Sequence, residues 1–143
     1  MAYATQADLE AQLSLDELIQ LTDDDGTGVI DAARVARAIA DADEEIDGYL
    51  QARLSVPIAP VPGIIRKVSV DLAIYNLYSR RGDAMPDTRR ERYEAAVKFL
   101  TKVAEGKIGL GANDPAGNPP DVGSVGVTLG GDRTMTRDKL DRY

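Results

Sequence analysis

The spacing of hydrophobic residues predicts two long helices in the middle of the chain. Between about residues 32 and 54, apolar side chains recur every three or four positions, which places them on one face of an α-helix. Between about residues 63 and 81, apolar side chains cover most of a helix circumference. The first stripe consists of Val35, Ile39, Ala42, Ile46 and Tyr49; the second set is Ile64, Ile65, Val68, Val70, Leu72, Ile74, Tyr75, Leu77 and Tyr78. The second helix is therefore expected to be central and the most buried.

Short helices are expected at the N-terminus, before the first long helix. Thr5 is followed three residues later by Asp8, and Ser14 by Glu17. The second pair has the S-x-x-E pattern of a capping box, in which two side chains satisfy free N–H groups at a helix start. Helices this short need a larger body to pack on.

Proline and glycine mark the boundaries of the later elements. Residues 55–63, SVPIAPVPG, carry three prolines and cannot be helical, so they predict a stiff apolar link. Gly82 is a natural stop for the second long helix. A further helix is expected at about 86–105, beginning at Pro86 and closed by Gly106.

These patterns predict an all-α fold, a small helical bundle over residues 1–107, followed by an extended arm over residues 108–143. The arm is rich in Gly, Pro, Asn and Asp and cannot bury enough apolar surface alone to offset its ordering entropy. Brief extended pairing is expected at residues 125–129. Residues 133–143 regain apolar and basic side chains, which favours a docking segment over the alternative of a disordered tail. Its candidate partner-binding residues are Arg133, Met135, Arg137, Leu140 and Tyr143.

Composition limits the chemistry available to the chain. Its 143 residues suffice for one domain, and the sequence contains neither Cys nor His. Thiolate nucleophiles, an imidazole base and Cys/His zinc sites are therefore excluded. We expect no enzyme activity and no cofactor. The sequence has no secretory signal pattern or membrane-spanning apolar stretch, so we expect synthesis in the cytoplasm and no membrane partner.

The net charge of −7 is unevenly distributed along the chain. Residues 1–47 hold thirteen acidic and two basic side chains, whereas residues 48–143 hold eleven acidic and fifteen basic ones. One interpretation is that these charges are solvated helix faces that maintain solubility. The other is a pair of complementary surfaces for head-to-tail association of identical subunits. The acidic total argues against tight binding to nucleic acid.

The stretch TDDDGTGVID, residues 22–31, resembles part of a calcium-binding loop. With Asp23 at the first position of a twelve-residue loop, the twelfth position is Arg34, where a helical hand needs a bidentate Glu. Because this closing acid is missing, a calcium-binding helical module using the Asp23–Asp31 turn is kept as the alternative hypothesis and not as the favoured one.

The favoured interpretation of the same stretch is a turn between two helices. Gly26 and Gly28 permit positive φ angles, and the surrounding acidic side chains can accept hydrogen bonds from backbone N–H groups. Asp31 is then the N-cap of the next helix.

Other candidate sites are weaker. Glu44, Glu45 and Asp47 have no His companion, which argues against a di-metal site. Residues 81–83 spell RGD, but a helix stop is favoured over an integrin ligand. Four arginines flank the same loop and could form a basic rim. This rim could contact another subunit, bind phosphate, or bind an acidic partner if the chain is a regulatory helical module. The other interpretation is that the four side chains are simply solvated. They are Arg80, Arg81, Arg89 and Arg90.

Several segments occur in a characteristic order: YATQADLEAQL at residues 3–13, the LIQLTDDDGTG turn, residues 35–81 with IDGYL, the alternating-proline link and VDLAIYNLYSRR, and RTMTRDKLDRY at the end. In this order the chain resembles the Mu-like phage neck proteins, described as head-tail adaptors. The resemblance covers nearly the whole chain.

The resemblance implies a helical structural subunit without catalytic residues. Such subunits assemble as a ring, typically of about twelve copies, beneath the portal protein at the capsid vertex, and DNA passes through the opening without sequence-specific binding. In related adaptors the C-terminal segment inserts into the portal, which would make residues 133–143 the portal-docking segment. The implied location is the virion neck, reached from the host cytoplasm, with a further neck or tail-completion protein on the tail side.

Overall fold

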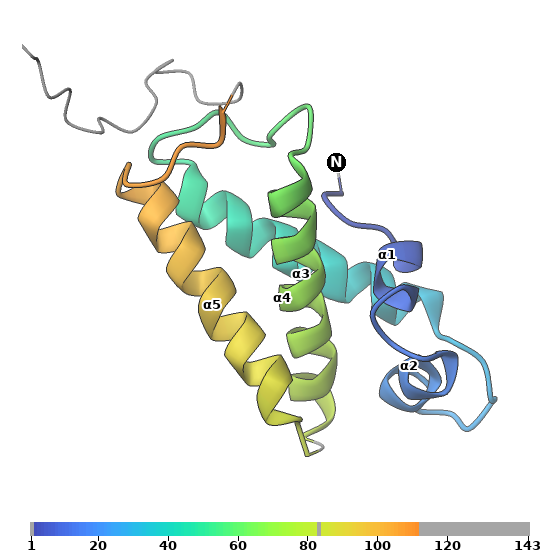
Figure 1. Cartoon of the computed structure of the whole chain (residues 1–143). Helices are drawn as coiled ribbons and strands as arrows, with labels where there is room; N and C mark the ends of the chain where they lie inside the picture. The colour runs from blue at the N-terminus through green and yellow to red at the C-terminus, as the bar shows by residue number, and fades with distance from the viewer. Residues whose placement is uncertain (1, 83, 112–143) are drawn as a thin grey trace, which may run out of the picture.

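The computed structural model describes residues 2–82 and 84–111, and this part of the chain contains helices and no strand. The fold is all-α, as predicted, and Figure 1 shows the five helices of a small bundle. They are α1 (Gln6–Glu10), α2 (Leu15–Thr22), α3 (Ala32–Leu50), α4 (Gly63–Arg81) and α5 (Asp87–Ala104).

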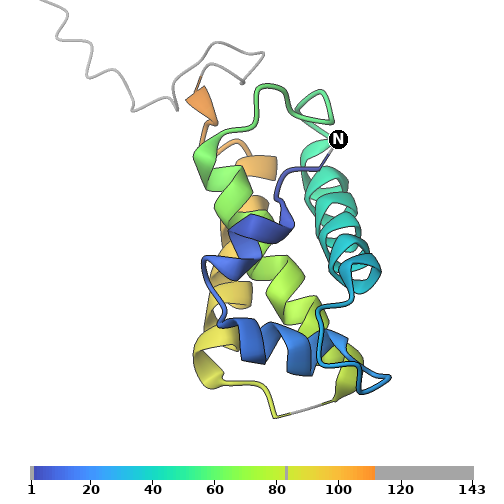
Figure 2. The same ribbon diagram turned by 90° about the vertical axis from the view of Figure 1, so that its right-hand side faces the viewer.

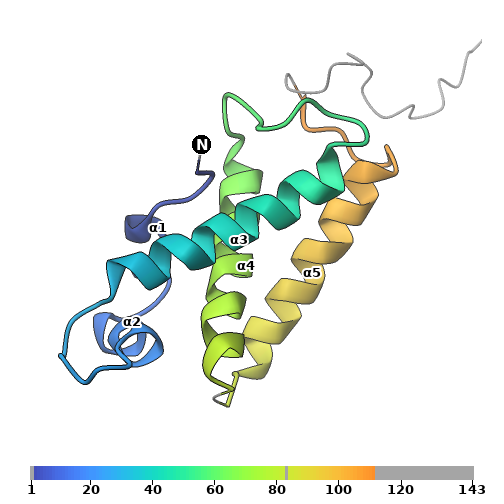
Figure 3. The same ribbon diagram turned by 180° about the vertical axis from the view of Figure 1, so that it is seen from behind.

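Helix α4 forms the centre of the bundle and contacts all four other helices. Helices α4 and α5 run side by side in opposite directions, while α1 and α2 lie on the other side of α4 (Figures 1 and 2). Helix α3 crosses behind this pair, and its outer side is not covered by another helix in Figure 3. Helices α3 and α4 pack directly on each other, and α1 contacts both of them.

The expected burial of α4 is confirmed along most of its length. Leu72 and Ala73 are fully buried, and Leu77 is 1% exposed. Ile64 is an exception, because 43% of this residue is exposed although the apolar pattern placed it in the core. It lies in the first turn of α4.

Helix α3 begins where the sequence predicted and ends earlier. The Asp31 side chain caps it by accepting hydrogen bonds from the backbone N–H groups of Ala33 (3.0 Å) and Arg34 (3.2 Å). The helix ends at Leu50, not near Leu54, although Leu54 is still buried. The N–H of Arg53 bonds to the carbonyl of Leu50 three residues back, so the chain tightens there and leaves the helix.

One of the two N-terminal caps differs from the sequence interpretation. Thr5 and Asp8 form the complete capping box. Ser14 accepts a hydrogen bond from the N–H of Glu17 (3.2 Å), but the Glu17 carboxylate does not return one to it. That carboxylate instead accepts a hydrogen bond from the hydroxyl of Tyr78 on α4. The expected box at Ser14 is thus only half formed, because a tertiary contact takes its second member.

The chain from α5 returns to the end of α3. Gly106 closes α5 with a φ of +77°, and Leu110 is only 9% exposed. The Arg53 guanidinium spans this junction by donating to the carbonyls of Val103 (3.1 Å) and Ile108 (3.4 Å). The first residues of the predicted arm therefore lie against the body. The pairing at residues 125–129 and the docking segment 133–143 lie outside the described residues, and the two-part division of the chain stays a prediction.

Candidate functional site

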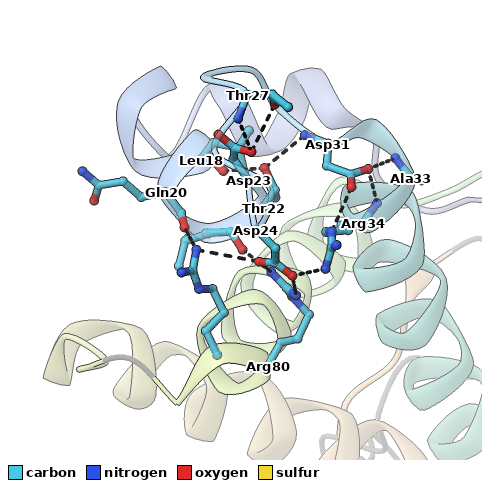
Figure 4. A network of polar contacts seen from close by, with 12 residues as sticks. Leu18, Gln20, Thr22, Asp23, Asp24, Thr27, Asp31, Ala33, Arg34 and Arg80 are labelled. Carbon is cyan, nitrogen blue, oxygen red and sulfur yellow. Dashed lines mark hydrogen bonds and ion pairs between the residues drawn. The ribbon is translucent and has the colours of Figure 1, made fainter.

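The acidic turn between α2 and α3 is held by hydrogen bonds to one carboxylate (Figure 4). Asp23 accepts from the backbone N–H of Thr27 (2.9 Å), the N–H of Gly28 (2.7 Å) and the Thr27 hydroxyl (3.1 Å). These hydrogen bonds, the one from the Thr27 N–H first among them, hold the pKa of Asp23 below its usual value. Gly26 and Gly28 both have φ of +73°, which confirms the predicted turn.

Asp24 joins this turn to the C-terminal end of α4. Its two carboxylate oxygens accept from the two terminal nitrogens of Arg80, at 2.7 and 2.9 Å. Arg34 also pairs with Asp24, and an Arg81 nitrogen lies 3.8 Å from it. The hydrogen bond from Arg80, more than any other interaction, lowers the pKa of Asp24. Arg80 also donates to the carbonyl of Leu21 at 2.7 Å, so the junction is held at two points.

Arg34, at the position where a calcium loop needs a closing acid, binds the acids of the turn. Its Nε lies 2.8 Å from Oδ2 of Asp31, and its Nη1 contacts Asp24. Within residues 2–82 and 84–111, no group of three or more His, Cys, Asp or Glu side chains is arranged to hold a metal ion. The carboxylates of Asp23 and Asp31 instead accept hydrogen bonds from backbone N–H groups, and Asp31 also binds the Arg34 guanidinium. This geometry does not favour the calcium alternative.

The four arginines of the predicted rim lie at the junction of α4 and α5. Arg80 and Arg81 point toward α2 and the acidic turn, where Arg81 donates to the carbonyl of Gln20. Arg89 donates to the carbonyl of Gln12 at 3.0 Å, whereas Arg90 lies 3.9 Å from Asp87 and keeps 58% of its side chain exposed. Three of the four thus contact the N-terminal helices or their connections, and a role in inter-subunit contact stays a prediction.

The RGD string coincides with the end of α4. Gly82 follows Arg81 with a φ of +68°, as expected of a glycine that stops a helix. Its third residue, position 83, lies outside the described residues.

A buried carboxylate on α3 escaped the sequence analysis. Asp43 is 8% exposed and accepts from the backbone N–H of Tyr3 (3.0 Å) and the hydroxyl of Ser69 (2.7 Å). Burial raises its pKa above the usual value. A signal was available, since Asp43 lies four residues after Ile39 and three before Ile46, on the apolar stripe itself.

Tyr3 connects this carboxylate to the proline-rich link. Its hydroxyl donates to Asp47 and accepts from the backbone N–H of Ile58 at 2.9 Å. Burial, followed by the hydrogen bond to Asp47, raises the pKa of Tyr3 to about 12. One side chain therefore ties the N-terminal segment to α3 and to the link at residues 55–62.

The other acids of α3 point in separate directions. Glu45 accepts from the hydroxyl of Tyr93 at 3.3 Å, and Asp47 accepts from Tyr3. Glu44 is exposed. Two of these three acids are therefore used for contacts inside the molecule.

The candidate portal-docking residues cannot be compared with this geometry. Arg133, Met135, Arg137, Leu140 and Tyr143 all lie outside the described residues. None of the described helices is both long and apolar enough to cross a membrane.

Comparison with known proteins places the chain among phage sequences. Residues 3–128 match the family described as Bacteriophage Mu, Gp36. The Mu-like prophage FluMu protein gp36 of Haemophilus influenzae is 34% identical over 112 residues, which cover 78% of this chain and 77% of that protein. Gene product J of Escherichia phage Mu is 31% identical over 123 residues, which cover 85% and 84%.

Proposed function

The chain belongs to the bacteriophage Mu Gp36 family, and from this premise we propose that it is a structural subunit of the phage neck, a head-tail adaptor. The observation that carries the proposal is the family match over residues 3–128, which spans nearly all the segments that resemble head-tail adaptors. The function is structural and non-enzymatic. Its location is the virion neck, after assembly in the host cytoplasm.

The described body suits a load-bearing subunit. Distant segments are joined by side-chain contacts as well as by the apolar core: Arg80 with Asp24, Tyr78 with Glu17, and Tyr3 with Asp47. Such contacts fix the N-terminal helices on α3 and α4. A rigid subunit of this kind can be repeated around an axis with the same contact at every interface.

The proposed partners are other copies of the chain, the portal protein and the next neck or tail-completion protein. About twelve copies form a ring beneath the portal, and DNA passes through the ring without sequence-specific recognition. The segment at 133–143 docks on the portal, with Met135, Leu140 and Tyr143 as apolar anchors beside Arg133 and Arg137. Binding of this segment supplies the free energy that orders it.

Electron microscopy of the isolated protein and of phage particles tests this proposal. We expect rings of the protein at the particle vertex. A protein that is monomeric in solution and absent from particles would refute the proposed function.

A truncation tests the portal-docking segment separately. Deleting residues 133–143 should leave the helix content and the melting temperature of the body nearly unchanged while abolishing binding to the portal. A chain with the same eleven residues in scrambled order is the matched control for length and charge, and it should also fail to bind. Equal loss of stability and of binding in the truncated chain would mean that the segment belongs to the core.

A further inference from the structure

A groove runs between the N-terminal segment and α3. Its volume is about 530 Å³, and residues 2–6 line one side while α3 lines the other. Ala4, Val35 and Ile39 contribute apolar surface, and no Lys or Arg is among the residues that line it. Its charged lining residues are Asp43, Glu44 and Asp47. We refer to this feature as the acidic groove.

A second, smaller hollow of about 230 Å³ has the opposite charge. It is lined by residues of α1, α4 and α5, including Arg66, Lys67 and Arg92. Asp71 also lines it, but its side chain is only 3% exposed and lies 2.7 Å from Lys67 and 3.8 Å from Arg92. Asp8 of α1 lines it too, so its charged residues are three cations and two acids, and Lys67 and Arg92 keep 64% and 48% of their side chains exposed. The hollow therefore carries more exposed basic than acidic charge.

An exposed apolar residue lies in the same turn of α4, although it does not line the hollow itself. Ile64 lies in the first turn of α4, two residues before Arg66, and 43% of it is exposed. The turn thus presents an apolar side chain together with two cations, Arg66 and Lys67. We call residues 63–67 and Arg92 the basic edge. Its combination of apolar and positive groups matches the apolar and negative lining of the acidic groove.

We infer that the acidic groove of one copy of this chain receives the basic edge of the next copy. The two surfaces lie at different places on one helical body, one on the N-terminal segment and α3 and the other on α1, α4 and α5, so a second copy must supply the contact. They share no residue, which makes the interface heterologous, and such an interface closes into a ring when the rotation between copies permits. The inference rests on the proposed function and specifies the surface by which the subunits join.

The charges of the two surfaces favour pairing of the acidic groove with the basic edge over pairing of two identical surfaces. Opposite charges across an interface steer association, and like charges brought together disfavour the wrong pairing. Groove against groove or edge against edge would place like charges together. Glu44 is the exposed acid of the groove, and Arg66 is an exposed cation of the edge. This pair is therefore the point at which the contact can be tested without disturbing the buried Asp43.

Charge reversal in the full-length chain provides the experiment. Association is measured by analytical ultracentrifugation for the wild type, Glu44→Lys and Arg66→Glu. Each variant alone should associate at least tenfold more weakly than the wild type. An equimolar mixture of the two should recover association, because the reversed groove of one variant then meets the reversed edge of the other and the two unaltered surfaces also match.

Control variants carry the same charge changes elsewhere. Glu94→Lys and Lys98→Glu lie at exposed positions of α5, outside both surfaces, and should associate as the wild type does. Circular dichroism establishes that every variant is folded. If the isolated wild type is monomeric, the same variants and their mixture are scored by incorporation into phage particles.

The outcomes separate this inference from the proposed function. Wild-type association in both reversed variants, or a mixture that fails to recover association, overturns the inference while leaving the neck function standing. Loss of association on deleting residues 133–143, with no effect of charge reversal, would identify the C-terminal segment as the occupant of the groove and also overturn it. A wild type that neither associates nor enters particles contradicts the proposed function itself.

Discussion

Arg80 binds Asp24 through both terminal nitrogens, at 2.7 and 2.9 Å, and so joins the end of α4 to the turn that precedes α3. Arg80→Ala should loosen this turn, because it removes the paired contacts and the hydrogen bond to the carbonyl of Leu21. Hydrogen exchange of the amides in residues 23–31 should accelerate, and the melting temperature should fall. Arg90→Ala is the control, since Arg90 makes a long contact with Asp87 and no other ion pair with the residues that the structure describes, and it should change neither quantity.

Acid should destabilise the body through the carboxylates of the turn. The pKa values of Asp24 and Asp31 are lowered by hydrogen bonds from Arg80 and Arg34 respectively. Their stabilising contribution is present above the ordinary Asp pKa of about 3.9 and is lost as pH falls through the lowered values in the fold. Melting temperatures measured from pH 6 down to about pH 2 should fall below about pH 4. The fall should be shallower for Asp24→Asn, and an unchanged slope would contradict this assignment.

The stability of variants at Asp43 should depend more on the hydrogen bonds that the new side chain can form than on its charge. Asp43→Asn keeps an oxygen for the N–H of Tyr3 and can donate to the hydroxyl of Ser69, so its stability near neutral pH should stay close to wild type. Asp43→Leu leaves both buried donors unpaired, at a cost of about 1–3 kcal/mol for each. Urea denaturation measures the difference. Equal stability of the two variants would mean that water satisfies the donors.

The raised pKa of Asp43 gives the same pair of variants a pH signature. Burial raises this pKa in the fold. At pH values above the ordinary Asp pKa, the cost of ionising the buried carboxyl therefore lowers the free energy of unfolding. Lowering the pH through the raised pKa relieves this effect, opposite in sign to the effect at Asp24. Asp43→Asn should remove this contribution and make the loss of stability in acid begin more abruptly.

Tyr3→Phe should weaken the attachment of the proline-rich link. The substitution removes the acceptor for the buried N–H of Ile58, which costs about 1–3 kcal/mol. Exchange of the Ile58 amide should accelerate in proportion. Tyr49→Phe, at a half-buried position of α3, removes the same hydroxyl group and should cost less than half as much. Equal costs would show that the hydroxyl of Tyr3 contributes nothing specific.

Two glycine-to-alanine substitutions should have opposite signs. A Cβ at Gly48 in α3 would meet no atom within 4 Å, so Gly48→Ala should stabilise the body by about 0.5–1 kcal/mol through helix propensity. Gly28 also has open space, but its φ of +73° should make Gly28→Ala cost about 1–2 kcal/mol. Thermal unfolding of both variants measures these changes. Stabilisation by Gly28→Ala would mean that the turn can change its backbone conformation.

Local sequence signals were enough to define most of the helices. The bounds of α4 agree with the prediction because Pro62 and Gly82 limit a strongly apolar segment. Asp31 caps α3 as predicted, since a cap depends only on neighbours in the chain. The family resemblance is also confirmed, whereas the arm and its docking residues stay predictions.

Long-range partners could not be predicted in the same way. Glu17 has the position of a capping-box acid, yet its carboxylate is used by Tyr78, which lies 61 residues away. Asp47 lies outside the apolar stripe of its helix, yet it accepts a hydrogen bond from Tyr3, which lies 44 residues away. Both choices depend on how the helices pack, and the spacing of residues along one helix carries no information about that packing.

The contacts of Arg53 with the carbonyls of Val103 and Ile108 have a mechanical consequence. The described residues end at Gly111, so a force applied from the C-terminal side reaches the buried Leu110 and then the contacts of Arg53, which lies just after the end of α3. Part of the force therefore acts on α3 before the C-terminal end of α5 separates from the bundle. Pulling experiments should find that the contacts at this junction break first.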